Sequence, residues 1–158
     1  MSINIGDSLP EVNFNVMGAE GPKAVSTAEL FKDKKVVLFA VPGAFTPGCS
    51  VTHLPGFVVN ADTIKAKGVD SIICTSVNDV FVMDAWGKAQ NAEALIMAAD
   101  GNGDFAKAIG LELDATGFAM GMRSKRYAMV VENGKVTHLG VDDKGIKLSA
   151  AEAIMDVL

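Results

Sequence analysis

The chain has 158 residues, and 14 Lys and Arg against 19 Asp and Glu give it a formal net charge of −5. This length predicts one domain over residues 1–158, long enough to bury a hydrophobic core. Apolar residues make up 49% of the chain and charged residues 21%, which argues against a disordered or collagen-like polypeptide. The negative balance argues against a nucleic-acid-binding surface, which needs clustered Lys and Arg.

No membrane-spanning or secretory segment is apparent in the sequence. No apolar run is longer than that of residues 36–41, which is far shorter than the ~20 residues that cross a bilayer. The first residues lack the basic and apolar regions of a signal peptide, so we expect a cytoplasmic location and no membrane partner. The two cysteines, Cys49 and Cys74, are too few for a disulfide framework, and a reducing compartment keeps thiols for reactivity or for packing.

The first elements that the sequence predicts are two buried strands separated by a helix. Residues 35–41 and 69–77 are short, β-branched and apolar without alternation, as in strands covered on both faces. Between them, Thr46 and Pro47 predict a helix start, with Thr as the N-cap and Pro in the first helical position. Pro55 predicts a kink in that helix. The order strand, helix, strand predicts a parallel pair.

The second half of the chain predicts two further helices and a hairpin. The helices are expected over residues 80–89 and 104–109. The dipeptide Asn133-Gly134 suits a type I′ turn, because both of its positions require a positive φ. It would join strands over residues 127–131 and 135–141.

A closing helix is predicted by Ser149 followed by Glu152, which form a capping box. The sequence of elements therefore predicts the α/β class, with a central mixed sheet that is flanked by helices, starts parallel and finishes antiparallel. This order matches a thioredoxin-like fold.

Cys49 lies in a loop that joins a buried strand to a helix. In the first helical turn its sulfur would meet free N–H groups and the helix dipole, which stabilise a thiolate. Thr46, three residues earlier, can cap the helix and reach the sulfur. The alternative is an ordinary buried cysteine in a loop rich in Pro and Gly, and Thr46 makes that alternative weaker.

The segment from Pro42 to Ser50, with His53-Leu54-Pro55, resembles the active-site signature of peroxiredoxins, and in particular the peroxiredoxin-5-like, or type II, subfamily. Further segments resemble the family in order along the chain: Ser76 to Asp79, Phe81 to Met83, Ala99 to Gly103, and Arg123 to Tyr127. The resemblance implies a thioredoxin-like fold. It also implies a thiol peroxidase that reduces hydrogen peroxide and organic hydroperoxides without a bound cofactor.

By position, the resemblance implies that Cys49 is the peroxidatic nucleophile, that Thr46 and Arg126 are its polar partners and that Pro42 shields it. These residue types suit the reaction, because negative charge develops on the leaving oxygen and fixed donors must receive it. A guanidinium stays protonated and can hold both sulfur and oxygen. Arg123 is the rival position for this arginine.

Two other motifs invite different functions. His53 follows Cys49 by four residues and permits a Cys–His hydrolase, but no orienting third residue is identifiable, so we expect a structural or supporting role for His53. The segment from Asp100 to Asp104 imitates the start of a calcium-binding loop, yet Phe105 and Leu111 replace the Gly and Glu that such a loop needs. We therefore expect a turn and helix cap there, and no metal site in the chain.

Two routes could recycle the oxidised Cys49. Some type II relatives carry a resolving cysteine where Cys74 stands, but Cys74 falls in a predicted buried strand, and a disulfide needs Cα atoms within about 7 Å. Other relatives place a resolving cysteine near the C-terminus, where this chain has Leu148. We favour glutathione, with or without glutaredoxin, as the reductant, and the alternative is a Cys49–Cys74 disulfide reduced by thioredoxin.

Two further expectations concern a competing function and the assembly of the chain. The competing function is a non-catalytic module of the same fold, in which Cys49 senses oxidants and signals to a partner. The family also implies a homodimer packed around the active-site loops, with Phe45, Phe81 and Phe118 as candidate contacts.

Overall fold

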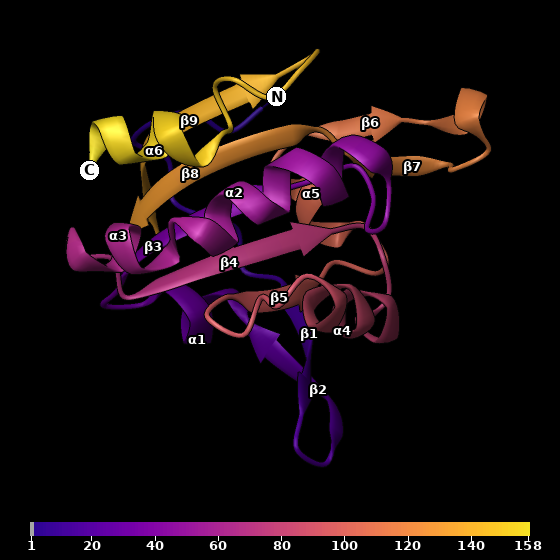
Figure 1. Cartoon of the computed structure of the whole chain (residues 1–158), viewed down its shortest axis with the longest axis horizontal. Helices are drawn as coiled ribbons and strands as arrows, with labels where there is room; N and C mark the ends of the chain where they lie inside the picture. Colours follow the sequence, from indigo (N-terminus) through magenta and orange to yellow (C-terminus); the bar gives the residue numbers. More distant parts are fainter. Residues whose placement is uncertain (1) are drawn as a thin grey trace.

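A seven-stranded sheet runs through the centre of the computed structural model, which describes residues 2–158 (Figure 1). In spatial order its strands are β2 (Gly21–Ser26), β1 (Asn13–Gly18), β5 (Ile96–Ala99), β4 (Ser71–Ser76), β3 (Lys35–Ala40), β8 (Arg126–Glu132) and β9 (Lys135–Asp142). Strands β3, β4 and β5 are parallel, whereas β1, β2, β8 and β9 join by antiparallel pairing. The predicted mixed sheet is therefore confirmed.

Helices cover both faces of the sheet. One face packs against α2 (Leu54–Val59), α3 (Ala61–Ala66), α4 (Val80–Ala89) and α6 (Ala151–Val157), and the other against α1 (Thr27–Phe31) and α5 (Asp104–Ala108). Along β3, Val37 and Phe39 belong to the first core, and Val36 and Leu38 to the second. Because both faces are covered, this strand is apolar throughout.

A small two-stranded sheet lies beside the main one. It pairs β6 (Glu112–Asp114) with β7 (Met122–Ser124), and the 3₁₀ turn η2 (Thr116–Phe118) joins them at the tip (Figure 1). Between residues 2 and 158, no helix combines the length and the apolar character needed to cross a bilayer.

Several local predictions are confirmed by the structure. Helix α4 spans the predicted residues 80–89. The carboxylate of Asp100 accepts hydrogen bonds from the N–H groups of Phe105 and Ala106, at 3.0 and 2.9 Å, so the calcium-like segment is a turn that caps α5. Asn133 and Gly134 have φ values of 49° and 76° between β8 and β9, as the hairpin requires.

The two predicted hydroxyl caps are wrong. The helix begins at Pro47 as predicted, but the Thr46 hydroxyl donates to the carbonyl of Gly43 at 2.6 Å and accepts no hydrogen bond from the first helical turn. The hydroxyl of Ser149 donates to Asp142 at 2.6 Å, and α6 begins after Ala150 without a side-chain cap. In both places the hydroxyl donates its hydrogen bond to a nearby oxygen acceptor, a carbonyl for Thr46 and a carboxylate for Ser149.

The predicted kink at Pro55 takes the form of a wide turn. Residues Cys49–His53 form the π-helical segment η1, in which the N–H of Leu54 donates to the carbonyl of Cys49. Pro55 has no N–H to give to the carbonyl four residues earlier, and the extra residue in the turn absorbs this mismatch. Cys49 and His53 are both buried in this segment.

Candidate active site

The turn that carries Cys49 is tied to its surroundings by side-chain hydrogen bonds. Asn78, which follows β4, accepts a hydrogen bond from the N–H of Ala44 at 3.0 Å. The indole N–H of Trp86, on α4, donates to the hydroxyl of Ser50 at 2.9 Å. The loop before Cys49 and the residue after it are therefore fixed to two neighbouring elements.

Arg126, the first residue of β8, contacts the sulfur of Cys49. Its Nη2 donates to Cys49 Sγ at 3.2 Å, and its Nη1 lies 2.8 Å from Nδ1 of His53. The Cys49 side chain is only 1% exposed. Because a guanidinium is always protonated, a fixed positive charge stands beside a sulfur that water hardly reaches.

His53 is neutral, and its partners set its tautomer. Arg126 can only donate, so Nδ1 of His53 must accept. The other ring nitrogen, Nε2, then carries the hydrogen and donates to the carbonyl of Ser149 at 2.8 Å. Burial, together with the positive charge of Arg126, lowers the pKa of His53 to about 4. With both nitrogens engaged, His53 has none free to act as a general base, which argues against the hydrolase alternative.

Asp142, at the end of β9, holds the loop that supplies this carbonyl. It accepts hydrogen bonds from the N–H groups of Lys147, Leu148 and Ser149 at 3.0, 3.1 and 2.9 Å. Burial opposes its ionisation, but these bonds and the Ser149 hydroxyl outweigh burial and lower the pKa of Asp142. A chain of polar contacts thus runs from Asp142 through Ser149, His53 and Arg126 to the sulfur. Sequence reasoning missed Asp142, and no local motif marks it.

The remaining predicted site residues are Thr46, Pro42 and Arg123. Because the Thr46 hydroxyl gives its proton to Gly43, its lone pairs are left to accept from a ligand. Pro42 and Arg126 both line a hollow of about 230 Å³. Arg123 instead donates to the carbonyls of Met120 and Val77, both at 2.9 Å, so the geometry favours Arg126 over Arg123 as the arginine of the site.

Cys74 lies inside the sheet. It is on β4, opposite Phe39 of β3 and Met97 of β5, with 0% of its surface exposed. Burial raises the pKa of the Cys74 thiol, so its reactive thiolate form is disfavoured. Both cysteines are free and belong to the same core.

The chemistry of the site therefore rests on one sulfur and one cation. Among residues 2–158, no group of three or more His, Cys, Asp or Glu side chains could hold a metal ion. A sulfur nucleophile beside a fixed guanidinium suits attack on an atom whose leaving group departs as an anion.

The neutral His53 predicts a pH-dependent stability. Its pKa falls from 6.5 to about 4 on folding, so between these values the unfolded chain binds a proton that the native protein does not. The free energy of unfolding then decreases as the pH falls through this window. The full difference of ~2.5 pKa units corresponds to about 3 kcal/mol.

Urea denaturation across this window measures the effect. The wild type should lose stability relative to His53→Gln, which cannot titrate, as the pH falls. The matched control is His138→Gln, which removes the other histidine and should keep the wild-type slope. Parallel curves for the wild type and His53→Gln would contradict the assignment.

Known proteins resemble this chain in both sequence and fold. The model of the family described as Redoxin matches residues 4–155. The chain is 43% identical to peroxiredoxin-2D of Arabidopsis thaliana over 159 residues, which cover 99% of this chain and 98% of that protein. It is 45% identical to peroxiredoxin-2C of Oryza sativa subsp. japonica over 160 residues, which cover 99% of this chain and 98% of that protein.

Solved structures agree with the sequence comparisons. Reduced Prx3 of Vibrio vulnificus in complex with H₂O₂ has a TM-score of 0.96 and 54% identity, over 98% of each chain. Peroxiredoxin 5 of Alvinella pompejana has a TM-score of 0.86 and 33% identity, over 97% of this chain and 96% of that one. The protein therefore belongs to the redoxin family, and it is a peroxiredoxin with a thioredoxin-like fold and the thiol peroxidase activity of that family.

Proposed function

We propose that this peroxiredoxin reduces hydrogen peroxide and organic hydroperoxides at Cys49 and is recycled by glutathione, with or without glutaredoxin. One observation carries the proposal: Arg126 contacts the sulfur of Cys49 at 3.2 Å, whereas Cys74 is fully buried in the sheet. The Cys49 sulfur has a cation beside it, whereas the Cys74 thiol is poorly placed to attack the oxidised Cys49 sulfur. A cytoplasmic location fits, because a reducing compartment supplies glutathione and keeps both thiols reduced.

The oxidation step is a displacement at oxygen. The Cys49 thiolate attacks the terminal oxygen of the hydroperoxide, an S–O bond forms, and the O–O bond breaks. Sulfur loses two electrons and becomes a sulfenic acid, while the leaving alkoxide or hydroxide takes a proton and becomes an alcohol or water. Arg126 stabilises the developing negative charge, and the hydroxyl oxygen of Thr46 accepts a hydrogen bond from the O–H of the bound hydroperoxide.

The reduction step uses two thiols in turn. A glutathione thiolate attacks the sulfenic sulfur of Cys49, which forms a mixed disulfide and releases the oxygen as water. A second thiol, from glutathione or from glutaredoxin, then attacks the glutathione sulfur and releases the Cys49 thiolate. Because Cys49 is 1% exposed, glutathione reaches it only when the η1 turn opens locally.

The hollow beside Arg126 supports glutathione as the reductant. Its volume is about 230 Å³, and Lys125 and Arg126 line it together with Asp142 and Asp143. Glutathione carries two carboxylates and one ammonium group, so it presents both signs of charge. A hollow that carries both signs of charge beside Arg126, the residue that contacts the reactive sulfur, complements these groups.

Replacement of Cys74 separates the two recycling routes. We predict that Cys74→Ser keeps turnover with glutathione and glutaredoxin within about twofold of the wild type, because an external thiol bypasses Cys74. Mass spectrometry after one equivalent of peroxide and then glutathione should find a single glutathione on Cys49. The matched variant Cys49→Ser should lose turnover.

Two results would reject this scheme. A Cys49–Cys74 disulfide in the wild type, with loss of turnover in Cys74→Ser, would establish thiol resolution within the chain and point to thioredoxin as reductant. Oxidation of Cys49 no faster than that of free cysteine would instead identify a non-catalytic sensing module.

We also propose that the protein is a homodimer that packs through the surroundings of the active site. Three aromatic side chains are exposed: Phe45 at 55%, Phe81 at 64% and Phe118 at 83%. They stand on the Cys49 loop, on the first turn of α4 and on η2. Large exposed apolar groups on elements that surround a functional site are typical of protein interfaces.

Sedimentation velocity at micromolar concentration tests the dimer. The wild type should sediment as a dimer, and the double variant Phe81→Ser/Phe118→Ser should shift toward monomer because it loses apolar contact area. Val59→Ser, on α2 and 81% exposed in the single chain, is the matched control and should remain dimeric. A wild type that is monomeric at this concentration would reject the proposal.

A further inference from the structure

The sheet has an opening between β1 and β5, away from the active site. Along its whole length β1 pairs with β2, from Asn13 opposite Ser26 to Gly18 opposite Gly21. With β5, in contrast, β1 pairs only at Asn15 opposite Ala99. Figure 1 shows the β1–β2 hairpin turning away from the rest of the sheet. Beyond that single pair, the facing edges of the two strands separate.

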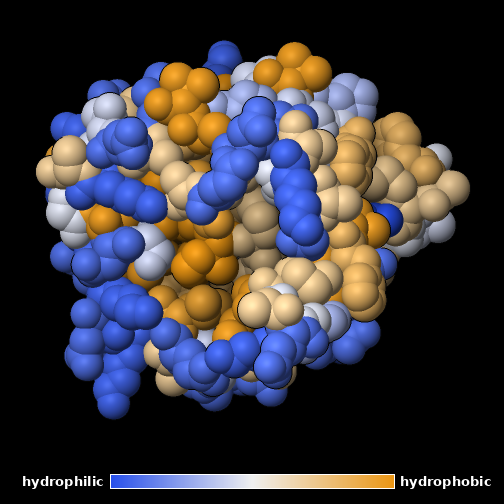
Figure 2. Space-filling model, turned by 60° about the horizontal axis from the view of Figure 1, so that its bottom comes forward, coloured by the Kyte–Doolittle hydropathy of each residue, from blue (hydrophilic) through white to orange (hydrophobic). Residues whose placement is uncertain are grey.

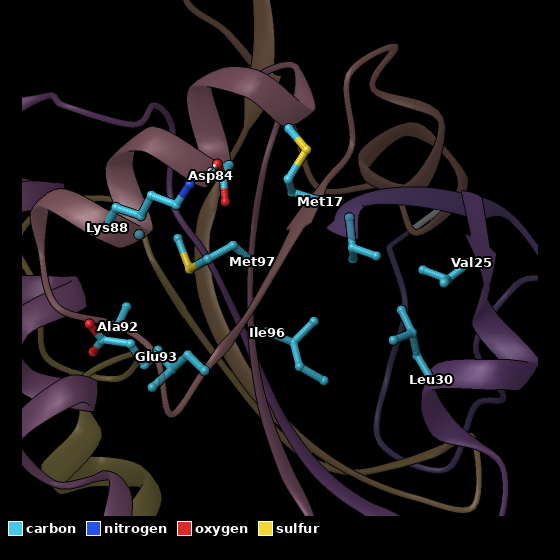
Figure 3. Close-up of a pocket in the computed structure, with 12 residues that line it drawn as sticks. Met17, Val25, Leu30, Asp84, Lys88, Ala92, Glu93, Ile96 and Met97 are labelled. Atoms are coloured by element: carbon cyan, nitrogen blue, oxygen red, sulfur yellow. Dashed lines mark ion pairs between the residues drawn. The ribbon is translucent and has the colours of Figure 1, made fainter. Parts of the chain in front are cut away.

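A cavity of about 500 Å³ occupies this opening, which we call the β1–β5 cleft. Its walls come from both faces of the sheet. Met17 and Met97 pack against the core under α4, whereas Val16 and Ile96 pack against the core under α1. Figure 2 shows an apolar hollow rimmed by hydrophilic side chains, and Figure 3 shows the residues that line the cleft, contributed by several elements.

The floor of the cleft depends on a glycine. A Cβ at Gly87, on α4, would lie 2.8 Å from Cγ of Met97, closer than packed carbon atoms approach. Glycine lets Met97 sit against the helix at this point. An unfilled space of this size also forfeits the contacts that its apolar walls would otherwise make, so a ligand that fills it gains them.

The charges at the rim select against anions. Lys88 forms an ion pair with Asp84 at 3.0 Å (Figure 3), which occupies the one lysine of the lining. Glu93 is the remaining charged residue there, so the lining carries a net negative charge. An apolar molecule with an acidic group would bring a second negative charge close to Glu93.

We propose that the β1–β5 cleft binds a neutral, apolar small molecule. The volume lies within the range of about 300–1,000 Å³ that is typical of small-molecule sites, and the walls combine aliphatic side chains with two adaptable methionines. The lining includes none of Cys49, Thr46 and Arg126, so this site is separate from the peroxide site.

Fluorescence titration with N-phenyl-1-naphthylamine, a neutral apolar dye, tests the site. The dye should bind the wild type in a saturable way, with one site per chain. Its matched anionic analogue, 8-anilinonaphthalene-1-sulfonate, should bind at least about tenfold more weakly, because it adds one negative charge.

Two variants locate the dye. Ile96→Trp fills the cleft and Met17→Glu adds an acid to its wall, so each should weaken dye binding by about tenfold or more, the scale of a lost apolar pocket. The matched control, Val59→Trp on the exposed side of α2, should bind as the wild type does. All three variants should still reduce peroxide, and this activity serves as the control that they are folded.

Four outcomes would overturn the proposal, and the first three concern dye binding to the wild type and to the variants. They are no saturable binding of the neutral dye, binding unchanged in both cleft variants, or tighter binding of the anionic analogue. If dye binding falls as protein concentration rises, a second copy of the chain covers the cleft, and the small-molecule proposal is likewise wrong.

Discussion

The active site depends on the two-sided contact of Arg126 with Cys49 Sγ and His53 Nδ1. A guanidinium needs an acceptor on each arm to hold one orientation, and His53 supplies the acceptor that the sulfur alone does not. The sheet register brings the arginine to this point, because Ala40 at the end of β3 pairs with Tyr127, the residue after Arg126. The cation thus belongs to the rigid sheet and the nucleophile to the turn above it.

Maintaining that contact requires a neutral imidazole and a fixed carbonyl. Asp142 holds the carbonyl of Ser149 in place through the loop of residues 147–149. Gly140 makes room for the same loop, since a Cβ there would overlap the carbonyl of Leu148. The C-terminal part of the chain is thereby coupled, through His53, to a sulfur about one hundred residues earlier, and it helps to orient the arginine.

Local patterns in the sequence predicted the buried strands, α4, the β8–β9 hairpin and the Asp100 turn, because each follows from neighbouring residues. The resemblance to peroxiredoxins pointed to Cys49 and Arg126. Patterns failed at the two hydroxyl caps, because the fold offers each hydroxyl another acceptor: Thr46 donates to Gly43 and Ser149 donates to Asp142. The tautomer of His53 and the cleft between β1 and β5 also depend on contacts that only the folded chain creates.

The central claim is that His53 aims Arg126 at the sulfur, and the rate of Cys49 oxidation by hydrogen peroxide in single-turnover stopped flow tests it most directly. We expect Arg126→Ala to slow this rate by about 10²-fold, the scale of one preorganised donor. His53→Phe, which suits the neighbouring rings of Phe39 and Phe57, should slow it by about tenfold, and His53→Gln, which retains a donor and an acceptor, should recover most of the loss. A wild-type rate in His53→Phe, or a larger loss in Arg123→Ala than in Arg126→Ala, would contradict the account.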